Sequence, residues 1–405
     1  MNNAAPIHAP IPPAVSVVLA GLIALAAVAL DITLVVLPAT TAELGGDAAQ
    51  SGLIVTAFLA GFAPGQLLWG FLGDRLGRRP TVLAGLGCFV AATIACAMAP
   101  TFGSLLAARF AQGLAGGVGP VLGRAVARDF ASEIAGARLL ALLMAALGTV
   151  PLLAPLIGAA LLARSDWRSV FWLTGIVGST LLVLAIARLP ETRAPGVARP
   201  SVLGLVGRTR TMLRTRDFRL GATLVALPFA GYHSILALYP SIAIDAFRID
   251  EMHFAWLFAA AAACFSLGSA ASRWLVARLG LQPLMVTAAG LCLAGGSLAA
   301  ISSARGSLAW LAAGVAVYVF GVGQMLPLAT TVALRQARES AAWTAAVLGL
   351  VQTIGGVVFS YLATLSGRLS MSLAVILLLC GSAALAVIAT YRVDSTARVS
   401  AAPNL

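Results

Sequence analysis

Length, composition and charge exclude most classes of soluble protein. The chain has 405 residues, of which 60% are hydrophobic and 10% charged, and its mean hydropathy is +0.98. A soluble domain is about a quarter charged, so we expect this chain to lie largely within a membrane. The net charge of +12 does not indicate a nucleic-acid partner, because the arginines punctuate loops and form no basic stripe interleaved with aromatic residues.

Hydropathy predicts twelve transmembrane helices, six in each half of the chain. Because lipid offers no partners for free backbone groups, such apolar helices should pack as a bundle. In the first half the expected spans are about 14–38, 51–72, 80–99, 103–126, 138–162 and 169–188. In the second half they are about 219–240, 252–275, 282–302, 306–333, 341–364 and 371–391. The predicted fold class is an all-α membrane protein, with an N-terminal six-helix lobe over 1–188, a linker over 189–218, and a C-terminal six-helix lobe with a short tail over 219–405.

Arginine positions predict the orientation of these helices, since membrane proteins concentrate basic residues on the cytoplasmic side. With the N-terminus inside, twenty arginines face the cytoplasm and five face outward. Both termini are therefore expected in the cytoplasm. The linker carries many of these arginines, either as a solvated basic loop that only sets topology or as a tether with an amphipathic segment on anionic headgroups.

The most charged loop in the first hundred residues reads GFLGDRLGRRP, from Gly70 to Pro80. Its R-L-G-x-x-P pattern at 75–80 returns at 278–283, an offset of 203 residues. A second landmark repeats at an offset of 202, because Asp31 and His233 each lie seven residues before a proline. The two offsets indicate a duplicated chain whose second copy has diverged.

Four stretches resemble those of one family of membrane proteins. The loop at Gly70–Pro80 resembles the signature between helices 2 and 3 of the major facilitator superfamily. RFAQG at 109–113 is similar to the R-x-x-Q-G of helix 4, and APLIGA at 154–159 resembles the G-P-x-x-G-G antiporter element of helix 5, with alanines at two glycine positions. DITLVVLPA at 31–39 resembles the acid-to-proline segment in helix 1 of drug efflux members. Together with the Asp-Trp-Arg at 166–168, the whole pattern looks most like the bicyclomycin-resistance (Bcr/CflA) branch of drug:proton antiporters.

The resemblance implies a fold, a location and a function. The fold would be two six-helix lobes related as parallel repeats, with a substrate site between them near the middle of the membrane. The location would be the plasma (inner) membrane of a bacterium. The function would be proton-coupled export of drug-like small molecules by alternating access, which is multidrug efflux by antiport and a source of antibiotic resistance.

Asp31 and Arg109 are the residues expected to couple transport to protons. At 1.5 Å per residue they lie about 10 Å and about 9 Å from the outer ends of their helices, so we expect the two charges at one depth in the first lobe. Ionisable residues within a membrane usually mark substrate or proton pathways. Burial would strengthen proton binding by the carboxylate and a nearby arginine would weaken it, so a changing separation would alternate its proton affinity. The alternative is a fixed buried ion pair that only stabilises the bundle.

The resemblance implies a cytoplasmic gate, a latch between the lobes that favours the outward-open state. Its residues are Gly70, Asp74, Arg75, Gly77, Arg78, Arg79 and Asp129. We expect Asp74 to accept hydrogen bonds from free N–H groups at a helix N-terminus, and Arg78 to pair with Asp129. In the second copy Ala277 and Gln282 stand where the first has an acid and an arginine, so a latch there should be weaker. The alternative is that these charges lie at the surface and only enforce topology.

The fifth span is expected to bend. Its prolines each remove a backbone hydrogen bond, and nearby glycines would suit a close-packed hinge against the second half, although proline kinks are common in membrane helices. The residues of this motif are Gly148, Pro151, Pro155 and Gly158.

Several polar residues are candidates for lining the substrate pocket. They are Gln112, Tyr232, His233, Gln324 and Gln352. His233 is either a second protonatable group or substrate contact, or a neutral imidazole bonded to a backbone carbonyl. Gln112 either binds substrate or satisfies a neighbouring helix. The rest of the pocket would be apolar, with Phe229 and Met325, which suits amphiphilic molecules.

Two other functions compete with efflux. One is import or uniport of a nutrient or metabolite, and the other is a membrane protein that does not transport, such as an intramembrane enzyme. Lysine is absent, no G-x-S-G nucleophile stretch occurs, and the three histidines are scattered, so an enzymatic site or a metal site has little to build from. We expect no enzyme, no metal and no cofactor, with the proton gradient as energy source. The expected partners are a small-molecule substrate, protons and the lipid bilayer, without nucleic acid, and the chain should function as a monomer.

Overall fold

The computed structural model describes residues 12–129, 133–193, 202–335 and 341–390, and this part of the chain is helical without strands. Its first half contains α1 (Pro13–Asp31), η1 (Leu34–Val36), α2 (Leu37–Glu43), η2 (Ala48–Gln50), α3 (Gly52–Leu76), α4 (Arg78–Ala97), α5 (Phe102–Gly116), α6 (Val118–Asp129), α7 (Glu133–Leu162) and α8 (Arg168–Arg188). Its second half contains α9 (Val202–Arg214), α10 (Arg216–Ser241), the π-helical turn η3 (Ile242–Ala246), α11 (Glu251–Leu279), α12 (Leu281–Arg305), α13 (Leu308–Leu334), α14 (Ala341–Leu365) and α15 (Leu369–Thr390).

These helices agree with most of the predicted spans. Among the described residues, eleven helical segments are long and apolar enough to cross a membrane. The remaining predicted span, about 138–162, falls on α7, where the stretch Gly148–Leu162 is apolar but shorter. The predicted linker is not structureless, because it contains α9, and α10 begins before its expected end.

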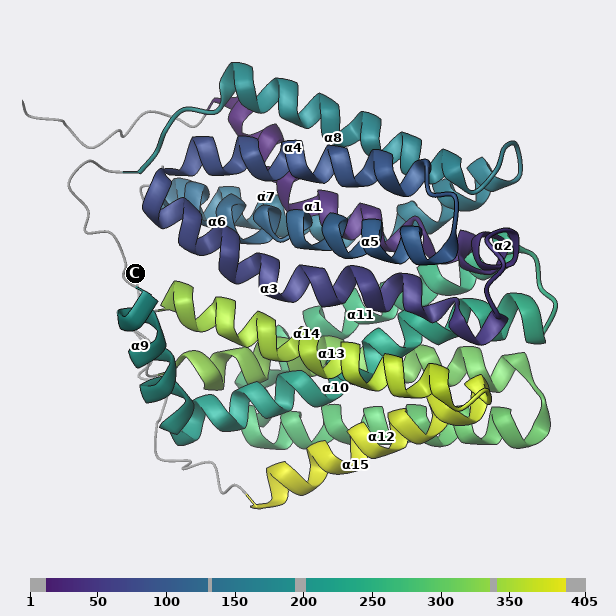
Figure 1. Ribbon diagram of the computed structural model, residues 1–405. Helices are drawn as coiled ribbons and strands as arrows, with labels where there is room; N and C mark the ends of the chain where they lie inside the picture. The colour runs from purple at the N-terminus through teal and green to yellow at the C-terminus, as the bar shows by residue number, and fades with distance from the viewer. Residues whose placement is uncertain (1–11, 130–132, 194–201, 336–340, 391–405) are drawn as a thin grey trace, which may run out of the picture.

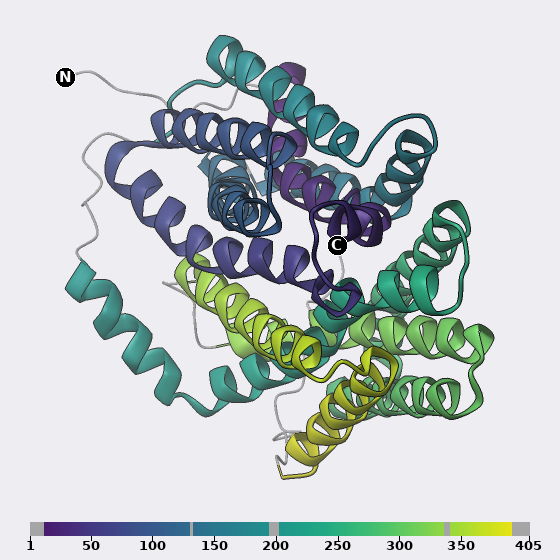
Figure 2. The ribbon, with the colours of Figure 1, turned by 45° about the vertical axis from the view of Figure 1, so that its right-hand side comes forward.

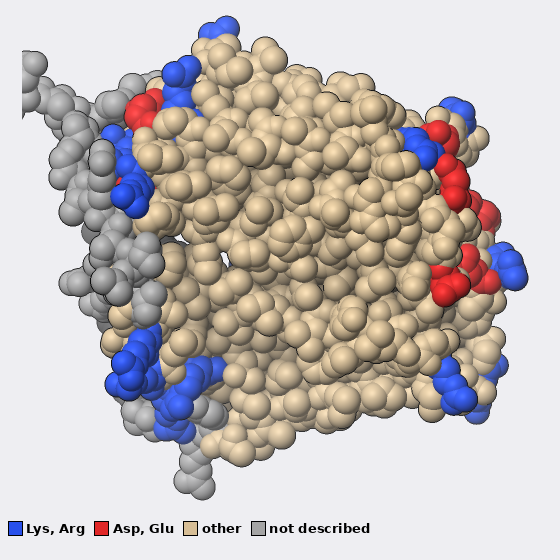
Figure 3. Space-filling model, viewed as in Figure 1, with Lys and Arg blue, Asp and Glu red and all other residues tan. Residues whose placement is uncertain are grey.

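The bundle consists of two groups of helices that meet along one seam. Figure 1 shows α1 and α3–α8 on one side of the molecule and α10–α15 on the other. The seam is formed where α3 packs against α10 and α14, and where α7 packs against α11. Figure 2 shows α14 lying beside α3 in a second view. Charged side chains gather at the two ends of the bundle, and the surface between the ends is almost free of them in the view of Figure 3.

Two of the predicted continuous spans are interrupted. The first breaks after Asp31, where α1 ends and the short turn η1 leads into α2. The fourth breaks at Gly117, between α5 and α6. A proline lies downstream of each break, Pro38 in the first and Pro120 in the second. Because proline has no N–H, the carbonyl four residues before it loses its helical partner, which weakens the helix at that point.

The two R-L-G-x-x-P loops have the same backbone form. Gly77 ends α3 with φ 111° and ψ 159°, and Gly280 ends α11 with φ 83° and ψ 168°. Both lie at positive φ, which glycine adopts without the steric cost that a side chain imposes. The sharp reversal between adjacent antiparallel helices is therefore present in both halves.

Candidate transport site

Asp31 is a buried acid at the break in the first membrane helix. It is the last residue of α1, and its exposed fraction is 4%. The turn η1 that follows it packs against α10 and α11, so the break faces the second lobe, and Tyr232 of α10 lies within electrostatic range of the carboxylate. Across the described residues no ion pair or hydrogen bond reaches the Asp31 carboxylate. An ionisable group held in this way is costly to keep charged, which is typical of a functional position.

Arg109 does not pair with Asp31 in this structure, so the fixed buried ion pair considered as the alternative is not formed here. Its guanidinium is fully buried and donates to the carbonyls of Ala29 at 3.1 Å and Ile54 at 3.3 Å. It also donates to Thr33 Oγ1 at 3.3 Å, and it lies 4.6 Å from the centre of the Phe58 ring. The similar depth predicted for the two charges did not establish contact, because depth along a helix leaves open which way each side chain points.

The broken helix explains why Arg109 binds carbonyls. The last helical bond of α1 runs from the N–H of Ile32 to the carbonyl of Val28, so the carbonyl of Ala29 has no intrahelical donor. The C-terminal end of a helix also carries partial negative charge, which a cation stabilises. A guanidinium has five donors and no acceptor, so it can bind several such oxygens at once. Arg109 therefore caps α1 from the neighbouring α5.

Gln112 belongs to this capping network and does not line an open pocket. Its Oε1 accepts from Arg109 Nη1 at 2.7 Å, and its Nε2 donates to Thr93 Oγ1 at 2.9 Å. All three side chains are completely buried within the first lobe. Thr93 of α4 was not anticipated from the sequence, because a lone threonine in an apolar helix gives no signal of a partner.

The helix 5 motif contributes to the same break. A Cβ on Gly158 would lie 2.5 Å from the carbonyl oxygen of Ile32, so glycine is needed where α7 crosses the end of α1. This contact is within the first lobe, while α7 also packs against α11 of the second, and the expected hinge against that lobe stays a prediction. A Cβ on Gly148 would meet nothing within 4 Å, and the helix continues through Pro151 and Pro155 as one element.

The second lobe presents aromatic side chains opposite the break. Ring centres of Phe229 and Tyr232 lie 5.5 Å apart, and Phe265 of α11 lies 6.1 Å from Tyr232. His233 joins this aromatic cluster at 5.7 Å from Phe229. Within the described structure the Nδ1 atom of His233 is buried without a hydrogen-bond partner, and it lies against Gly356 of α14. One possibility from the sequence was a neutral imidazole bonded to a backbone carbonyl. The Nδ1 atom of His233 makes no such bond in the described structure.

The two other glutamines differ in burial. Gln324 of α13 is buried, and its Oε1 finds no hydrogen-bond partner among the described residues. Gln352 of α14 is partly exposed. Met325 is buried beside Gln324. Among the described residues of the second lobe, His233 and Gln324 are two of the buried polar groups that retain capacity for a ligand, together with Ser360 and Asp245.

The cytoplasmic gate motif forms a charged cluster at the end of the bundle that carries most arginines. Arg78 donates to Asp74 at 2.6 Å and to Asp129 at 3.1 Å, so the predicted pairing with Asp129 is confirmed. Asp74 does not cap a helix N-terminus as we expected, because it lies in the last turn of α3 and reaches the side chain of Arg78. Within the described chain, every partner of Arg78 belongs to the first half, so the expected latch between lobes is not formed in this structure.

Glu191 takes the capping role instead and was missed by sequence reasoning. Its carboxylate accepts from the backbone N–H groups of Arg78 at 2.9 Å and Arg79 at 3.2 Å, at the start of α4. It also accepts from the N–H groups of Thr192 and Arg193. Burial favours the protonated form, but these four hydrogen bonds outweigh it and hold the pKa of Glu191 below its usual value. An acid at the start of the arginine-rich linker was the available signal.

The remaining motif residues support this cluster by packing. A Cβ on Gly77 would lie 2.5 Å from Glu191 Oε2, so glycine there leaves room for the carboxylate. Gly70 faces Val121, Arg75 lies over the Phe71 ring, and Arg79 donates to the carbonyl of Ile186 at 2.9 Å.

The opposite end of the seam is closed by direct contact between the lobes. Ser51, before α3, and Ser241, at the end of α10, share a hydrogen bond of 2.5 Å and are both buried. A Cβ on Gly52 would lie 2.9 Å from the carbonyl oxygen of Ala237. The backbones therefore approach closely, and the two lobes are in direct contact at the end of the seam opposite the gate motif.

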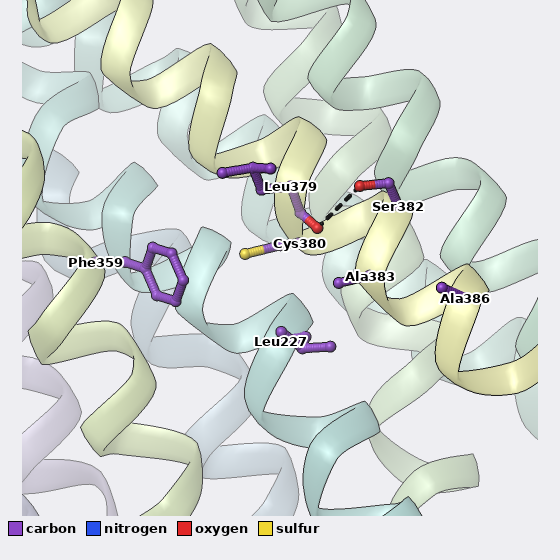
Figure 4. Close-up of a pocket in the computed structure, with 7 residues that line it drawn as sticks. All are labelled: Leu227, Phe359, Leu379, Cys380, Ser382, Ala383 and Ala386. Atoms are coloured by element: carbon purple, nitrogen blue, oxygen red, sulfur yellow. Dashed lines mark hydrogen bonds between the residues drawn. The ribbon is translucent and has the colours of Figure 1, made fainter. Parts of the chain in front are cut away.

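An apolar cavity of about 480 Å³ lies elsewhere, between α10, α14 and α15. Figure 4 shows its lining, in which the only drawn hydrogen bond joins the Ser382 hydroxyl to the Leu379 carbonyl. Leu379 and Ser382 are exposed on the lateral surface. This cavity lacks the acid and the unpartnered polar groups described above, so it is not the candidate site.

Comparison with known proteins agrees with this architecture. The model of the Major Facilitator Superfamily matches residues 19–360. The chain is 28% identical over 338 residues to the multidrug resistance protein MdtL of Escherichia fergusonii, covering 84% of this chain and 85% of that protein, and 27% identical to MdtL of Escherichia coli over the same length.

Solved structures share the fold at low sequence identity. A D-xylose–proton symporter superposes with a TM-score of 0.70 at 15% identity, covering 92% of this chain and 96% of the symporter. A POT family transporter in complex with 5-aminolevulinic acid has a TM-score of 0.71 at 14% identity, covering 93% and 94%. Family match, spans and fold agree, and the chain belongs to the major facilitator superfamily of membrane transporters.

Proposed function

We propose that this transporter exports drug-like small molecules in exchange for protons, as a multidrug efflux antiporter of the Bcr/CflA type in a bacterial inner membrane. The observation that carries the proposal is the Asp31 carboxylate. It is buried at the break of α1, faces the second lobe, and has no ion-pair partner in the described chain. An acid in this position can take up and release a proton without breaking a salt bridge.

Arg109 has a different role from the one first expected. Because its donors are bound to α1 carbonyls and to side chains of the first lobe, it holds the broken end of α1 in place and positions Asp31. Proton affinity at Asp31 would then change when the second lobe moves, since the turn η1 that follows Asp31 packs against α10 and α11 of that lobe. Opening the site to water would favour the charged carboxylate and closing it would favour the protonated acid, so the proton gradient sets the direction: the more acidic outer side supplies the proton and the cytoplasm receives it.

The exchange cycle follows from these two states. Asp31 binds a proton when the site opens outward, the substrate leaves, and the lobes rock about the seam. The proton is released on the cytoplasmic side, and a new substrate binds to the deprotonated carrier. In this cycle the bond between Ser51 and Ser241 would belong to the stage after the outer gate has shut.

The wall around Asp31 supports an apolar or amphiphilic substrate. The aromatic cluster of Phe229, Tyr232, His233 and Phe265 provides a large apolar surface, and His233 and Gln324 add two polar contacts. Such a mixture binds many shapes through surface burial and selects few of them by hydrogen bonding. The relatives described as multidrug resistance proteins favour the same substrate class.

Everted membrane vesicles that hold a proton gradient provide the test. Candidate drugs are added while lumenal acidity is read with a fluorescent dye, for wild type, Asp31→Asn and Asp47→Asn. Asp47 is exposed and caps a short turn, so this variant controls for the same chemical change at the surface.

We expect drug addition to collapse the gradient in wild type and Asp47→Asn but not in Asp31→Asn. If no compound acts on wild type while a nutrient accumulates, import replaces export. If Asp31→Asn still responds, the coupling proton lies elsewhere.

A further inference from the structure

The helix α9 carries a basic surface that transport does not use. The sequence between Glu191 and Asp217 contains six arginines and no acid. Arg210 and Arg214 are exposed, and in the described part of the chain neither takes part in a hydrogen bond or an ion pair. Figure 3 shows the resulting cluster of basic atoms at the lower left, over α9 and the start of α10.

The position of α9 places this surface beside the membrane. Only Thr215 separates α9 from α10, and α10 belongs to the membrane-spanning segment Arg216–Ala246. The helix must therefore lie at the level where that span leaves the bilayer. Figure 1 shows α9 at the arginine-bearing end of the molecule, running across the direction of the bundle helices.

The pattern along α9 is that of an interfacial helix. In the sequence of α9 the apolar residues recur at helical spacing, and the arginines lie to either side of them on a helical projection. Met212 is packed against the core, but Leu213 is 45% exposed. An exposed leucine between arginines matches the boundary between headgroups and acyl chains, where the apolar side chain enters the lipid and the cations stay at the surface.

The protein holds α9 firmly enough for lipid binding to affect the bundle. Trp343 Nε1 of α14 donates to Thr209 Oγ1 at 2.8 Å, and α9 packs against α10 and α14. The same α14 lines the seam between the lobes, where a Cβ on Gly349 would lie 2.9 Å from Gln66 Oε1 of α3. A ligand on α9 would therefore stabilise the inner end of a helix that borders the transport site.

We propose that α9 binds anionic phospholipid headgroups of the adjacent leaflet, with Arg210 and Arg214 contacting phosphate and Leu213 inserted among the acyl chains. The exposed cations of this segment complement the negative surface of a bilayer that contains anionic lipid. This binding anchors the second lobe at the membrane surface, and it does not depend on which substrate is transported.

Thermal unfolding of the purified full chain in neutral detergent tests the proposal. Phosphatidylglycerol or phosphatidylcholine is titrated in, and the unfolding midpoint is recorded for wild type, R210Q/R214Q and the control R305Q/R368Q. The control removes two exposed arginines from the opposite end of the bundle. A ligand that binds only the folded state raises the midpoint as its concentration increases.

We expect phosphatidylglycerol to stabilise wild type and the control, with little effect of phosphatidylcholine. R210Q/R214Q should need about 30-fold more phosphatidylglycerol for the same shift, and R210K/R214K should behave like wild type. The shift should shrink as salt rises, because the arginines are exposed and their charges are screened. The proposal is overturned if R210Q/R214Q follows the wild-type curve or if phosphatidylcholine stabilises equally.

The variant Leu213→Ser distinguishes binding of a phospholipid from binding of a soluble phosphate ligand. We expect it to weaken the response to phosphatidylglycerol, because it removes the apolar contact with the acyl chains. Inorganic phosphate at matched charge should leave the midpoint of wild type unchanged. An equal shift with inorganic phosphate would contradict a membrane-surface role.

Discussion

The two lobes use one packing device with different chemistry. In the first, Arg109 of α5 donates to the carbonyl of Ala29 in α1 at 3.1 Å. In the second, the Tyr318 hydroxyl of α13 donates to the carbonyl of Pro228 in α10, also at 3.1 Å. The first helix of the N-terminal lobe ends at Asp31, whereas its counterpart α10 continues to Ser241.

This difference explains where the charges lie. A broken helix exposes several carbonyls and the negative end of its dipole, which only a multiple donor with positive charge can satisfy. An unbroken helix has no such free carbonyls at this point, so the Tyr318 hydroxyl only adds one neutral hydrogen bond to it. His233, which matches Asp31 in the repeat, is accordingly a neutral wall residue in our proposal, and proton chemistry is confined to the first lobe.

The reversal loops show the same contrast. Gly77 and Gly280 share their backbone conformation, but among the described residues an ion cluster surrounds only the first. Arg278 of the second loop stacks over Trp274 at 3.8 Å, where the first loop has ion pairs. Fold geometry is therefore common to both copies, and charge chemistry belongs to one.

The largest expected difference between the two lobes comes from substituting the two donors, Arg109 and Tyr318. Arg109→Met leaves buried oxygens of α1 and α3 unsatisfied, and we expect about 3 kcal/mol or more of destabilisation. Tyr318→Phe removes one neutral hydrogen bond and should cost about 1 kcal/mol. Thermal unfolding in detergent measures both, and equal losses would contradict the distinction.

Alanine at the two loop glycines should give a smaller difference. Both variants are strained by positive φ, at about 1 kcal/mol each. Gly77→Ala also forces Glu191 from its site, because the new Cβ would lie 2.5 Å from its carboxylate oxygen. At Gly280 the nearest atom is 3.9 Å away. We expect the first variant to be clearly less stable in the same unfolding assay, and the idea fails if Gly280→Ala is the worse of the two.

The smallest expected effect is a loss of stability at low pH, caused by protonation of Glu191. Its pKa is lowered on folding from a usual value near 4.5, so its stabilising contribution is present above that pH and is lost as the pH falls below it. The wild-type unfolding midpoint should fall more steeply below that pH than that of Glu191→Gln. Parallel curves would show that the carboxylate does not stabilise the loop.

The sequence predicted the helices well because long apolar runs leave the chain no other way to satisfy its backbone in lipid. It did not predict the breaks after Asp31 and at Gly117, since proline affects a carbonyl four residues upstream and many prolines are tolerated in membrane helices. The structure shows where each of these two spans is interrupted.

Contacts within the candidate site were harder to anticipate than its residues. Asp31 and Arg109 were singled out by their charge, but their relative facing depends on helix rotation, which spacing along one helix does not provide. The α4 partners of Glu191, Arg78 and Arg79, are more than a hundred residues away in the chain, so no local pattern relates them. Arg78 and Asp129 were paired correctly because both lie at helix ends on one face of the membrane.

In our proposal Asp31 alone carries the coupling proton. Proton release on substrate binding is the most direct test of this assignment. Purified protein in unbuffered detergent solution would be mixed with a transported drug while a pH indicator is read, for wild type, Asp31→Asn and His233→Gln. We predict proton release by wild type and His233→Gln and none by Asp31→Asn, with drug binding by each variant measured separately. Release that persists in Asp31→Asn and disappears in His233→Gln would contradict the assignment and move the coupling site to the second lobe.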